Sequence, residues 1–356
     1  MIKPLTSLRF FFALAVFLHH YIVGDSAIFA NGFIGVSFFF ILSGFILSYS
    51  YKDRLFSGKT SIWDFYVARF ARIYPLHLLT FLAFIPLLVY TNSVPNWKVL
   101  FSNLFLFQSW SPYRNWYFSV NFPSWSISDE AFFYAVFPVL LYFFMKKSCY
   151  AKTIAIAVCL LVYAVSIFYP WEQYQAHALF YVNPLFRLVD FGIGIVLYSI
   201  WDNYSQKKYN INKLKATILE IGSIGILIFM IWFSKYIPKT FTYACYYWLP
   251  MSAIIYLFAI QQKGFVTILL SKKVLVLLGE ISYAFYMFHI PVIRYSDAII
   301  KKISETGWQI HELTRFIIVF TAIFTISFLS FHYFETPINR KIKGLFKKYK
   351  LKHSLR

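Results

Sequence analysis

Long apolar stretches dominate the chain, and short connectors rich in Gly, Pro or charge separate them. Ten stretches are about 20 residues long, the length that an α-helix needs to cross a bilayer. A further apolar segment, Trp97 to Gln108, is too short to span and predicts an interfacial or re-entrant helix. We expect the spans at roughly 5–23, 32–51, 70–91, 126–145, 151–169, 182–201, 216–235, 242–261, 274–296 and 312–334.

The pattern predicts an all-α, polytopic transmembrane helix bundle, with no repeat or separate soluble domain. We expect one membrane domain at 1–338 and a basic tail at 339–356. Of the 356 residues, 60% are hydrophobic and 13% are charged. Soluble domains carry about 25% charged residues, so composition excludes a water-soluble protein.

A net charge of +20 suits nucleic acid, but the placement of the cations indicates a membrane topology instead. With the N-terminus inside, 25 Lys and Arg residues fall in inner segments and eight in outer ones. The positive-inside rule then places both termini in the cytoplasm. The basic tail would lie against the anionic inner leaflet, so we expect no nucleic-acid partner.

The first span contains an arginine and a histidine, Arg9 and His20. Eleven helical steps bring both to nearly one face, about 16 Å apart. Ionisable groups inside a membrane are costly and usually functional. The alternatives are a snorkelling Arg9 and a His20 bonded to a neighbouring carbonyl. His19 faces about 100° away, so we interpret it as structural.

The second and third spans add small residues and a pair of cations. Gly35, Ser43 and Gly44 would allow a helix or a ligand to approach closely, with packing the favoured interpretation. Arg69 and Arg72 share one helix face at the expected inner end of the third span. Two guanidinium groups suit phosphate oxygens, although an ordinary positive flank has the same spacing.

The fourth span begins with a serine and two acids. Ser126 and Asp129 match a capping pair, which is a structural role. Glu130 points into an aromatic helix one turn later, where a carboxylate could transfer protons or pair with an arginine.

Two later spans also hold ionisable residues. Arg187 and Asp190, three residues apart, predict an internal ion pair. His289 comes just before Pro291, which we expect to break the helix. His289 could then bond freed carbonyls or contact substrate. The spacing of His and Cys predicts no metal site.

These segments, in this order, resemble the membrane acyltransferase-3 family. Each motif is weak alone, but together they cover nearly the whole chain. Two positions depart from the family pattern, Ala68 before the paired arginines and Asp129. The motifs are Leu8-Arg9 with His20, Gly35 to Phe45, Arg69-x-x-Arg72-Ile-Tyr-Pro75, Trp125 to Tyr134, Phe186 to Gly194, Gly279 to Pro291, and Glu335-x-Pro337.

The resemblance implies transfer of an acyl group, most often acetyl, from cytoplasmic acyl-CoA to a sugar hydroxyl. The acceptor would be a surface polysaccharide or a lipid-linked precursor, at the bacterial inner membrane, with acetyl-CoA as donor and no metal. It implies catalytic roles for His20, Glu130 and Arg9, and donor-phosphate binding by Arg69 and Arg72. Further residues that we expect near substrate are Ser126, Ser128, Arg187 and His289.

Two other classes of protein also hide charges in a helix bundle. A transporter or flippase of a lipid-linked sugar predicts inverted repeats, which the chain lacks. A membrane glycosyltransferase using a polyprenyl-phosphate sugar predicts a sizeable polar external domain, whereas the largest external loop expected is 92–125. Consumption of radiolabelled acetyl-CoA separates the enzyme from both classes.

Overall fold

The computed structural model describes residues 2–22, 31–146, 148–168, 172–205, 211–260 and 263–354. The described residues form helices and no strand, which confirms the predicted all-α class. The longer helices are α1 (Lys3–Tyr21), α3 (Gly35–Phe56), α4 (Ile62–Tyr90), α7 (Ser124–Lys146), α8 (Ser148–Phe168), α10 (Pro184–Ser205), α11 (Lys213–Phe233), α13 (Trp248–Ile260), α15 (Lys273–Ser304), α16 (Glu312–Ser330) and α17 (Thr336–Ser354). The shorter ones are α5 (Trp97–Leu104), α6 (Arg114–Tyr117), α9 (Gln173–Ala176), α12 (Lys239–Ala244), α14 (Phe265–Leu270) and the 3-10 or π turns η1 (Gly32–Ile34), η2 (Gln108–Trp110), η3 (His177–Val182), η4 (Ser234–Tyr236) and η5 (Phe331–Glu335).

Within the described chain, eight helical segments are long and apolar enough to cross a membrane. The protein is therefore a multi-pass membrane protein. The two other predicted spans correspond to α1, which carries Arg9 and two histidines, and to α8, in which Thr153–Phe168 forms a shorter apolar helix. The count of ten spans and the cytoplasmic termini stay predictions.

Close helix contacts in the bundle depend on glycine. Helices α3 and α10 pack through Gly44 and Gly194, where a Cβ atom on Gly44 would lie 2.1 Å from the Phe191 carbonyl oxygen. A Cβ atom on Gly35 would lie 2.6 Å from the Phe12 carbonyl oxygen of α1. Only glycine allows backbones to approach this closely, so the predicted packing role of Gly35 and Gly44 is confirmed.

Several prolines lie inside the long helices, and an asparagine compensates for two of them, Pro75 of α4 and Pro291 of α15. Proline cannot donate to the carbonyl four residues earlier, which leaves that oxygen free. Asn339 Nδ2 donates to the Ala71 carbonyl, which Pro75 leaves free, at 3.0 Å. Asn121 Nδ2 donates to the Met287 carbonyl, which Pro291 leaves free, at 2.9 Å.

The expectation that Pro291 breaks its helix is therefore wrong. Helix α15 continues to Ser304 because Asn121 satisfies the freed carbonyl. A proline inside a membrane helix is tolerated when another group bonds to the carbonyl that it leaves free.

Helix α4 begins earlier than the hydropathy pattern predicts. Ser61 and Asp64 form a reciprocal capping box, with Asp64 N donating to Ser61 Oγ at 3.1 Å and Ser61 N donating to Asp64 Oδ2 at 3.0 Å. Such a box fixes a helix start before the apolar run. Arg69 and Arg72 consequently lie about two turns inside α4, and not at its end as predicted.

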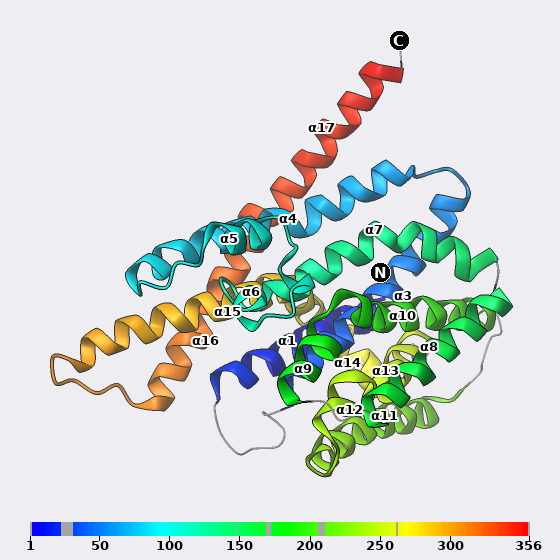
Figure 1. The fold of residues 1–356 in the computed structure, drawn as a ribbon. Helices are drawn as coiled ribbons and strands as arrows, with labels where there is room; N and C mark the ends of the chain where they lie inside the picture. Colours follow the sequence, from blue (N-terminus) through cyan, green and yellow to red (C-terminus); the bar gives the residue numbers. More distant parts are fainter. Residues whose placement is uncertain are drawn as a thin grey trace.

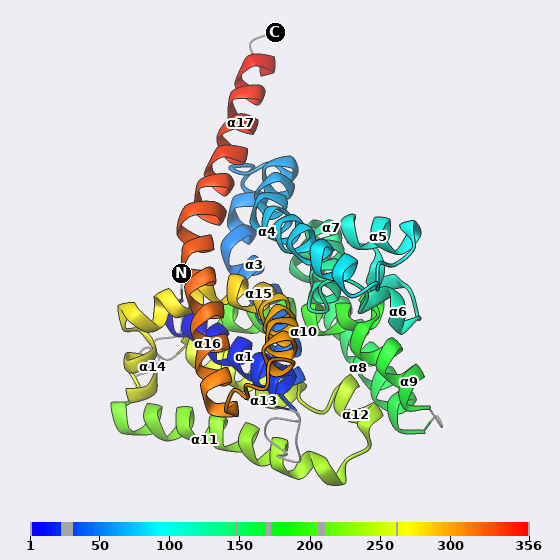
Figure 2. The ribbon, with the colours of Figure 1, turned by 90° about the vertical axis from the view of Figure 1, so that its left-hand side faces the viewer.

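The described part of the basic tail is helical, and the chain continues from α16 through η5 into α17. Helix α17 packs along α4 and then extends beyond the rest of the bundle, as Figures 1 and 2 show. Helix α1 lies inside the bundle, in contact with α3 and α15.

Candidate functional site

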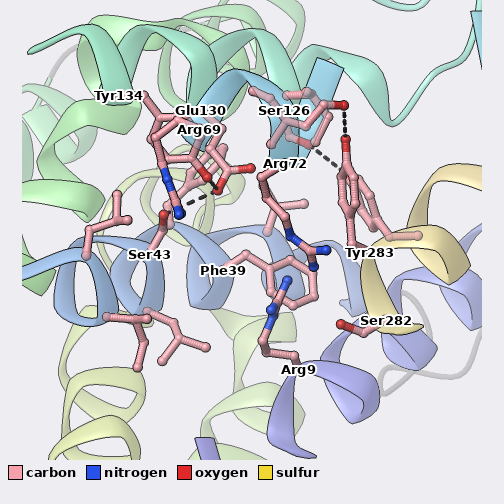
Figure 3. Close-up of a pocket in the computed structure, with 18 residues that line it drawn as sticks. Arg9, Phe39, Ser43, Arg69, Arg72, Ser126, Glu130, Tyr134, Ser282 and Tyr283 are labelled. Atoms are coloured by element: carbon pink, nitrogen blue, oxygen red, sulfur yellow. Dashed lines mark hydrogen bonds between the residues drawn. The ribbon is translucent and has the colours of Figure 1, made fainter. Parts of the chain in front are cut away.

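Three arginines and one glutamate from three helices line a central pocket (Figure 3). Arg9 comes from α1, Arg69 and Arg72 from α4, and Glu130 from α7. The guanidinium groups of Arg9 and Arg72 point into the same space. The pocket has a volume of about 150 Å³. Its other polar lining residues are Ser43, Ser126, Tyr134, Ser282, Tyr283 and Tyr286.

Glu130 is held by hydroxyl groups and not by an arginine. Ser43 Oγ donates to Glu130 Oε1 at 3.3 Å, and Tyr134 OH donates to the same oxygen. These two donors orient the carboxylate toward the pocket. From the sequence, we predict that Glu130 either transfers protons or pairs with an arginine. The hydroxyl donors, and not an arginine, hold its side chain in place.

The arginines differ in how strongly the protein engages them. Arg69 Nη2 donates to Tyr51 OH at 3.0 Å, and Arg72 Nη1 lies 3.4 Å from Glu335 Oε2. None of the described residues forms a hydrogen bond or an ion pair with Arg9. A cation without a partner inside a bundle is costly, so Arg9 is placed to receive an anionic or carbonyl oxygen.

A second pocket, of about 290 Å³, lies at the other end of α1 and is lined by histidines and aromatic rings. His20 lines it, beside His19. Arg114 of α6 and His177 of η3 reach it from segments far along the chain. Burial, with Arg114 nearby, lowers the pKa of His177 to about 4, so its imidazole is neutral at pH 7.

The imidazole of His20 is hydrogen-bonded to the imidazole of His289. His289 Nε2 lies 3.1 Å from His20 Nδ1, and His289 Nδ1 lies 2.5 Å from the Tyr286 carbonyl oxygen. His20 Nδ1 also lies 3.0 Å from the Val16 carbonyl oxygen. His289 itself is fully buried and lines neither pocket, so it contacts His20 and not the open space.

The two pockets share a wall. Tyr286 and Val36 line both of them, and Ser126 Oγ lies 2.8 Å from Tyr286 OH. Arg9 and His20 come from the same helix, but each lines a different pocket. Tyr286 stands between the pocket of the arginines and the pocket of the histidines.

Besides His289, two other residues predicted near substrate line neither pocket. Arg187 Nη2 lies 2.7 Å from Asp190 Oδ2 and the side chains are 2% and 1% exposed, which confirms the predicted ion pair. Ser128 Oγ donates to the Leu106 carbonyl at 2.5 Å and accepts from Ser109 Oγ at 2.7 Å. Both residues hold elements of the bundle together.

The predicted capping pair of Ser126 and Asp129 does not form. Ser126 Oγ donates to the Pro123 carbonyl at 2.8 Å, and the carboxylate oxygens of Asp129 are buried. Helix α7 begins two residues before Ser126, which places the serine inside the first turn and aims it at Tyr286.

Sequence reasoning did not identify His177 and Arg114, and it set His19 aside. His177 and Arg114 lie in connecting segments and carry no local motif. His19 lines the second pocket at the place where the turn η1 packs against α1, since a Cβ atom on Gly32 would lie 2.7 Å from His19 Cβ. Among the described residues, no group of three His, Cys, Asp or Glu side chains is placed to hold a metal ion.

The chain resembles known acyltransferases over most of its length. The model of the acyltransferase domain family matches residues 4–332. The acyltransferase MdmB of Streptomyces mycarofaciens is 32% identical over 327 residues, covering 83% of this chain and 79% of that protein. No solved structure matches the chain.

Two longer relatives also match. The peptidoglycan O-acetyltransferase OatA of Listeria monocytogenes is 24% identical over 338 residues, covering 87% of this chain and 52% of that protein. The putative peptidoglycan O-acetyltransferase YrhL of Bacillus subtilis is 26% identical over 370 residues, covering 95% and 55%. The chain thus spans about half the length of these two relatives.

Proposed function

The chain belongs to the acyltransferase-3 family, as its motifs predicted, and we propose that it transfers an acetyl group from cytoplasmic acetyl-CoA to a sugar hydroxyl. The acceptor is a surface polysaccharide or its lipid-linked precursor, and the enzyme lies in the bacterial cytoplasmic membrane. Relatives named as peptidoglycan O-acetyltransferases support a glycan acceptor.

The observation that carries the proposal is the set of hydrogen bonds around His20, from which its tautomer follows. A carbonyl oxygen only accepts, so the Nδ1 atom of His289, 2.5 Å from the Tyr286 carbonyl, carries a proton. In a neutral His289 the Nε2 atom is then an acceptor. His20 Nδ1 donates to it and to the Val16 carbonyl, which leaves His20 Nε2 with a free lone pair. This is the tautomer that a general base requires.

The donor binds on the other side of Tyr286, in the central pocket. Arg69 and Arg72 bind the inner part of the donor, and Arg9 holds the arm that carries the thioester past Tyr286 toward His20. Arg9 is suited to bind a carbonyl or phosphate oxygen of the donor, because none of the described residues forms a hydrogen bond or an ion pair with its guanidinium group. Glu130, oriented by Ser43 and Tyr134, holds the donor arm or the acceptor by a hydrogen bond.

The transfer step is direct. His20 Nε2 removes the proton of the acceptor hydroxyl, and the oxygen attacks the thioester carbonyl carbon. The carbon–sulfur bond then breaks, and the coenzyme A thiolate takes up the proton from His20. An acyl-enzyme relay is the alternative, and it would give ping-pong kinetics.

Two measurements test the proposal. Membranes containing the protein should transfer or hydrolyse radiolabelled acetyl-CoA, whereas a flippase would leave it intact. Mass spectrometry of surface glycans should find acetyl groups that disappear on deletion of the gene and return on complementation. Unchanged glycans together with intact acetyl-CoA would overturn the proposed activity.

A further inference from the structure

A third cavity, of about 690 Å³, is lined by cations and lies between the end of α3, the first turns of α4 and one face of α17. We call it the basic cavity. Asp64 is the acidic residue among its lining, and Lys350 Nζ lies 2.9 Å from Asp64 Oδ2. The cavity therefore keeps a large excess of positive charge. Its cationic lining residues are Arg54, Lys59, Lys343, Lys347 and Lys350.

Helix α17 presents only one face to the basic cavity. Lys343, Lys347 and Lys350 are spaced by four and three residues, so they share that face. Two contacts next to the start of α17 fix its rotation, the hydrogen bond from Asn339 to the Ala71 carbonyl and the Arg72–Glu335 ion pair. The remaining lysines of α17, Lys341, Lys348 and Lys352, lie about 140° to 180° away on the opposite face.

The basic cavity adjoins the central pocket through one hydrogen bond. Tyr51 lines the basic cavity, Arg69 lines the central pocket, and Arg69 Nη2 donates to Tyr51 OH at 3.0 Å. At about 150 Å³, the central pocket is smaller than sites that enclose a drug-sized ligand, which span about 300–1,000 Å³. A nucleotide does not fit there, whereas the basic cavity lies within that range.

We propose that the basic cavity binds the phosphate groups at the nucleotide end of the acyl-CoA donor. This inference rests on the proposed function and extends its donor site outward from Arg69 to α17. Lysines act as compact point charges that bind phosphate without a fixed geometry. The narrow acyl-bearing arm would then pass Arg69 and Tyr51 into the central pocket and extend along Arg9 toward Tyr286.

The test compares two triple variants with equal loss of charge. Lys343→Gln, Lys347→Gln and Lys350→Gln remove the lysines that line the cavity. Purified proteins in neutral phosphatidylcholine nanodiscs are assayed for release of coenzyme A. The matched control carries Lys341→Gln, Lys348→Gln and Lys352→Gln.

The cavity variant should raise the KM for acetyl-CoA by about tenfold or more, because hydrogen bonds between ammonium and phosphate groups are charge-assisted. Its KM for acetyl-pantetheine, which lacks the nucleotide, should change by less than about twofold, and so should kcat. The wild type should prefer acetyl-CoA to its 3′-dephospho form, and the cavity variant should lose that preference. The control variant should behave as wild type with all three donors.

Other outcomes overturn the inference. Equal effects of both triple variants would assign the effect to the charge of the tail. An unchanged KM for acetyl-CoA, combined with a changed response to added phosphatidylglycerol, would assign the cavity to a lipid headgroup. If the wild type releases no coenzyme A from any donor, the proposed function itself fails, and this result is distinct from a wild type that is active and insensitive to the cavity lysines.

Discussion

Arg187→Leu should strongly destabilise the protein without a direct effect on substrate binding. The substitution removes the partner of Asp190, whose carboxylate lies 2.7 Å from the guanidinium group, and the two side chains are only 2% and 1% exposed. Breaking a buried pair leaves an uncompensated charge and costs about 3–5 kcal/mol. Trp248 Nε1 still donates to Asp190 at 2.5 Å in the variant, so we expect the free energy of unfolding to fall by about 3 kcal/mol, the lower end of that range.

The assay is chemical unfolding in detergent, followed for single and double variants. Arg187→Leu with Asp190→Leu should recover at least half of the loss, since an apolar pair leaves no buried charge. The control is Arg315→Leu, which breaks a more exposed pair with Asp297 and should cost about 0–1 kcal/mol. A single variant as stable as wild type, with a raised acceptor KM, would refute the reasoning and return Arg187 to the substrate site.

Three further outcomes follow from packing and titration. Gly44→Ala should lower the free energy of unfolding by about 1–3 kcal/mol. Gly192→Ala is the control: its added Cβ atom meets no atom within 4 Å, so the free energy of unfolding should rise by about 0.5–1 kcal/mol. Equal effects of the two substitutions would contradict the close approach at Gly44. Asn121→Leu should cost about 1–3 kcal/mol because the Met287 carbonyl loses its donor, and no loss in urea titrations would count against this role. Burial lowers the pKa of His177 to about 4, so the unfolded chain binds this proton first as the pH falls. Between pH 7 and pH 5 the wild type should therefore lose about 2 kcal/mol more of its free energy of unfolding than His177→Gln does, and equal losses would be contrary evidence.

Local patterns in the sequence predicted the elements and the chemistry of the central pocket. Hydropathy located the helices because burial in lipid requires about 20 apolar residues. Arg9 and Glu130 stood out because lipid-embedded charges are costly, and the pair of Arg69 and Arg72 stood out because two guanidinium groups share one helix face. The structure brings these residues together, although they come from three helices.

Local sequence patterns could not predict which helices lie next to one another in the bundle. Nothing near His177 indicates that it lines the same pocket as His20, because their proximity depends on how η3 and α1 pack. The course of α15 past Pro291 depends on Asn121, which lies 166 residues away from the carbonyl it satisfies. Hydropathy indicates which residues are buried but carries no information about such long-range hydrogen bonds.

The start of α4 could have been read from the sequence. Ser61 and Asp64 have the spacing of a capping box, and they lie before the apolar run that defined the predicted span. A helix predicted to begin at that capping box would have placed Arg69 and Arg72 inside the bundle. The predicted donor site would then have been a buried pocket and not a surface at the inner rim.

The proposal that His20 is the base has a direct test in acetyl transfer from radiolabelled acetyl-CoA by purified His20→Ala in proteoliposomes, at matched protein amounts and thermal stability. We expect the rate to fall by about 10² to 10⁴-fold, the usual contribution of a general base. His289→Gln should give a smaller loss, since a glutamine can still accept from His20 Nδ1. A His20→Ala protein that transfers acetyl groups at nearly the wild-type rate would contradict the proposed mechanism.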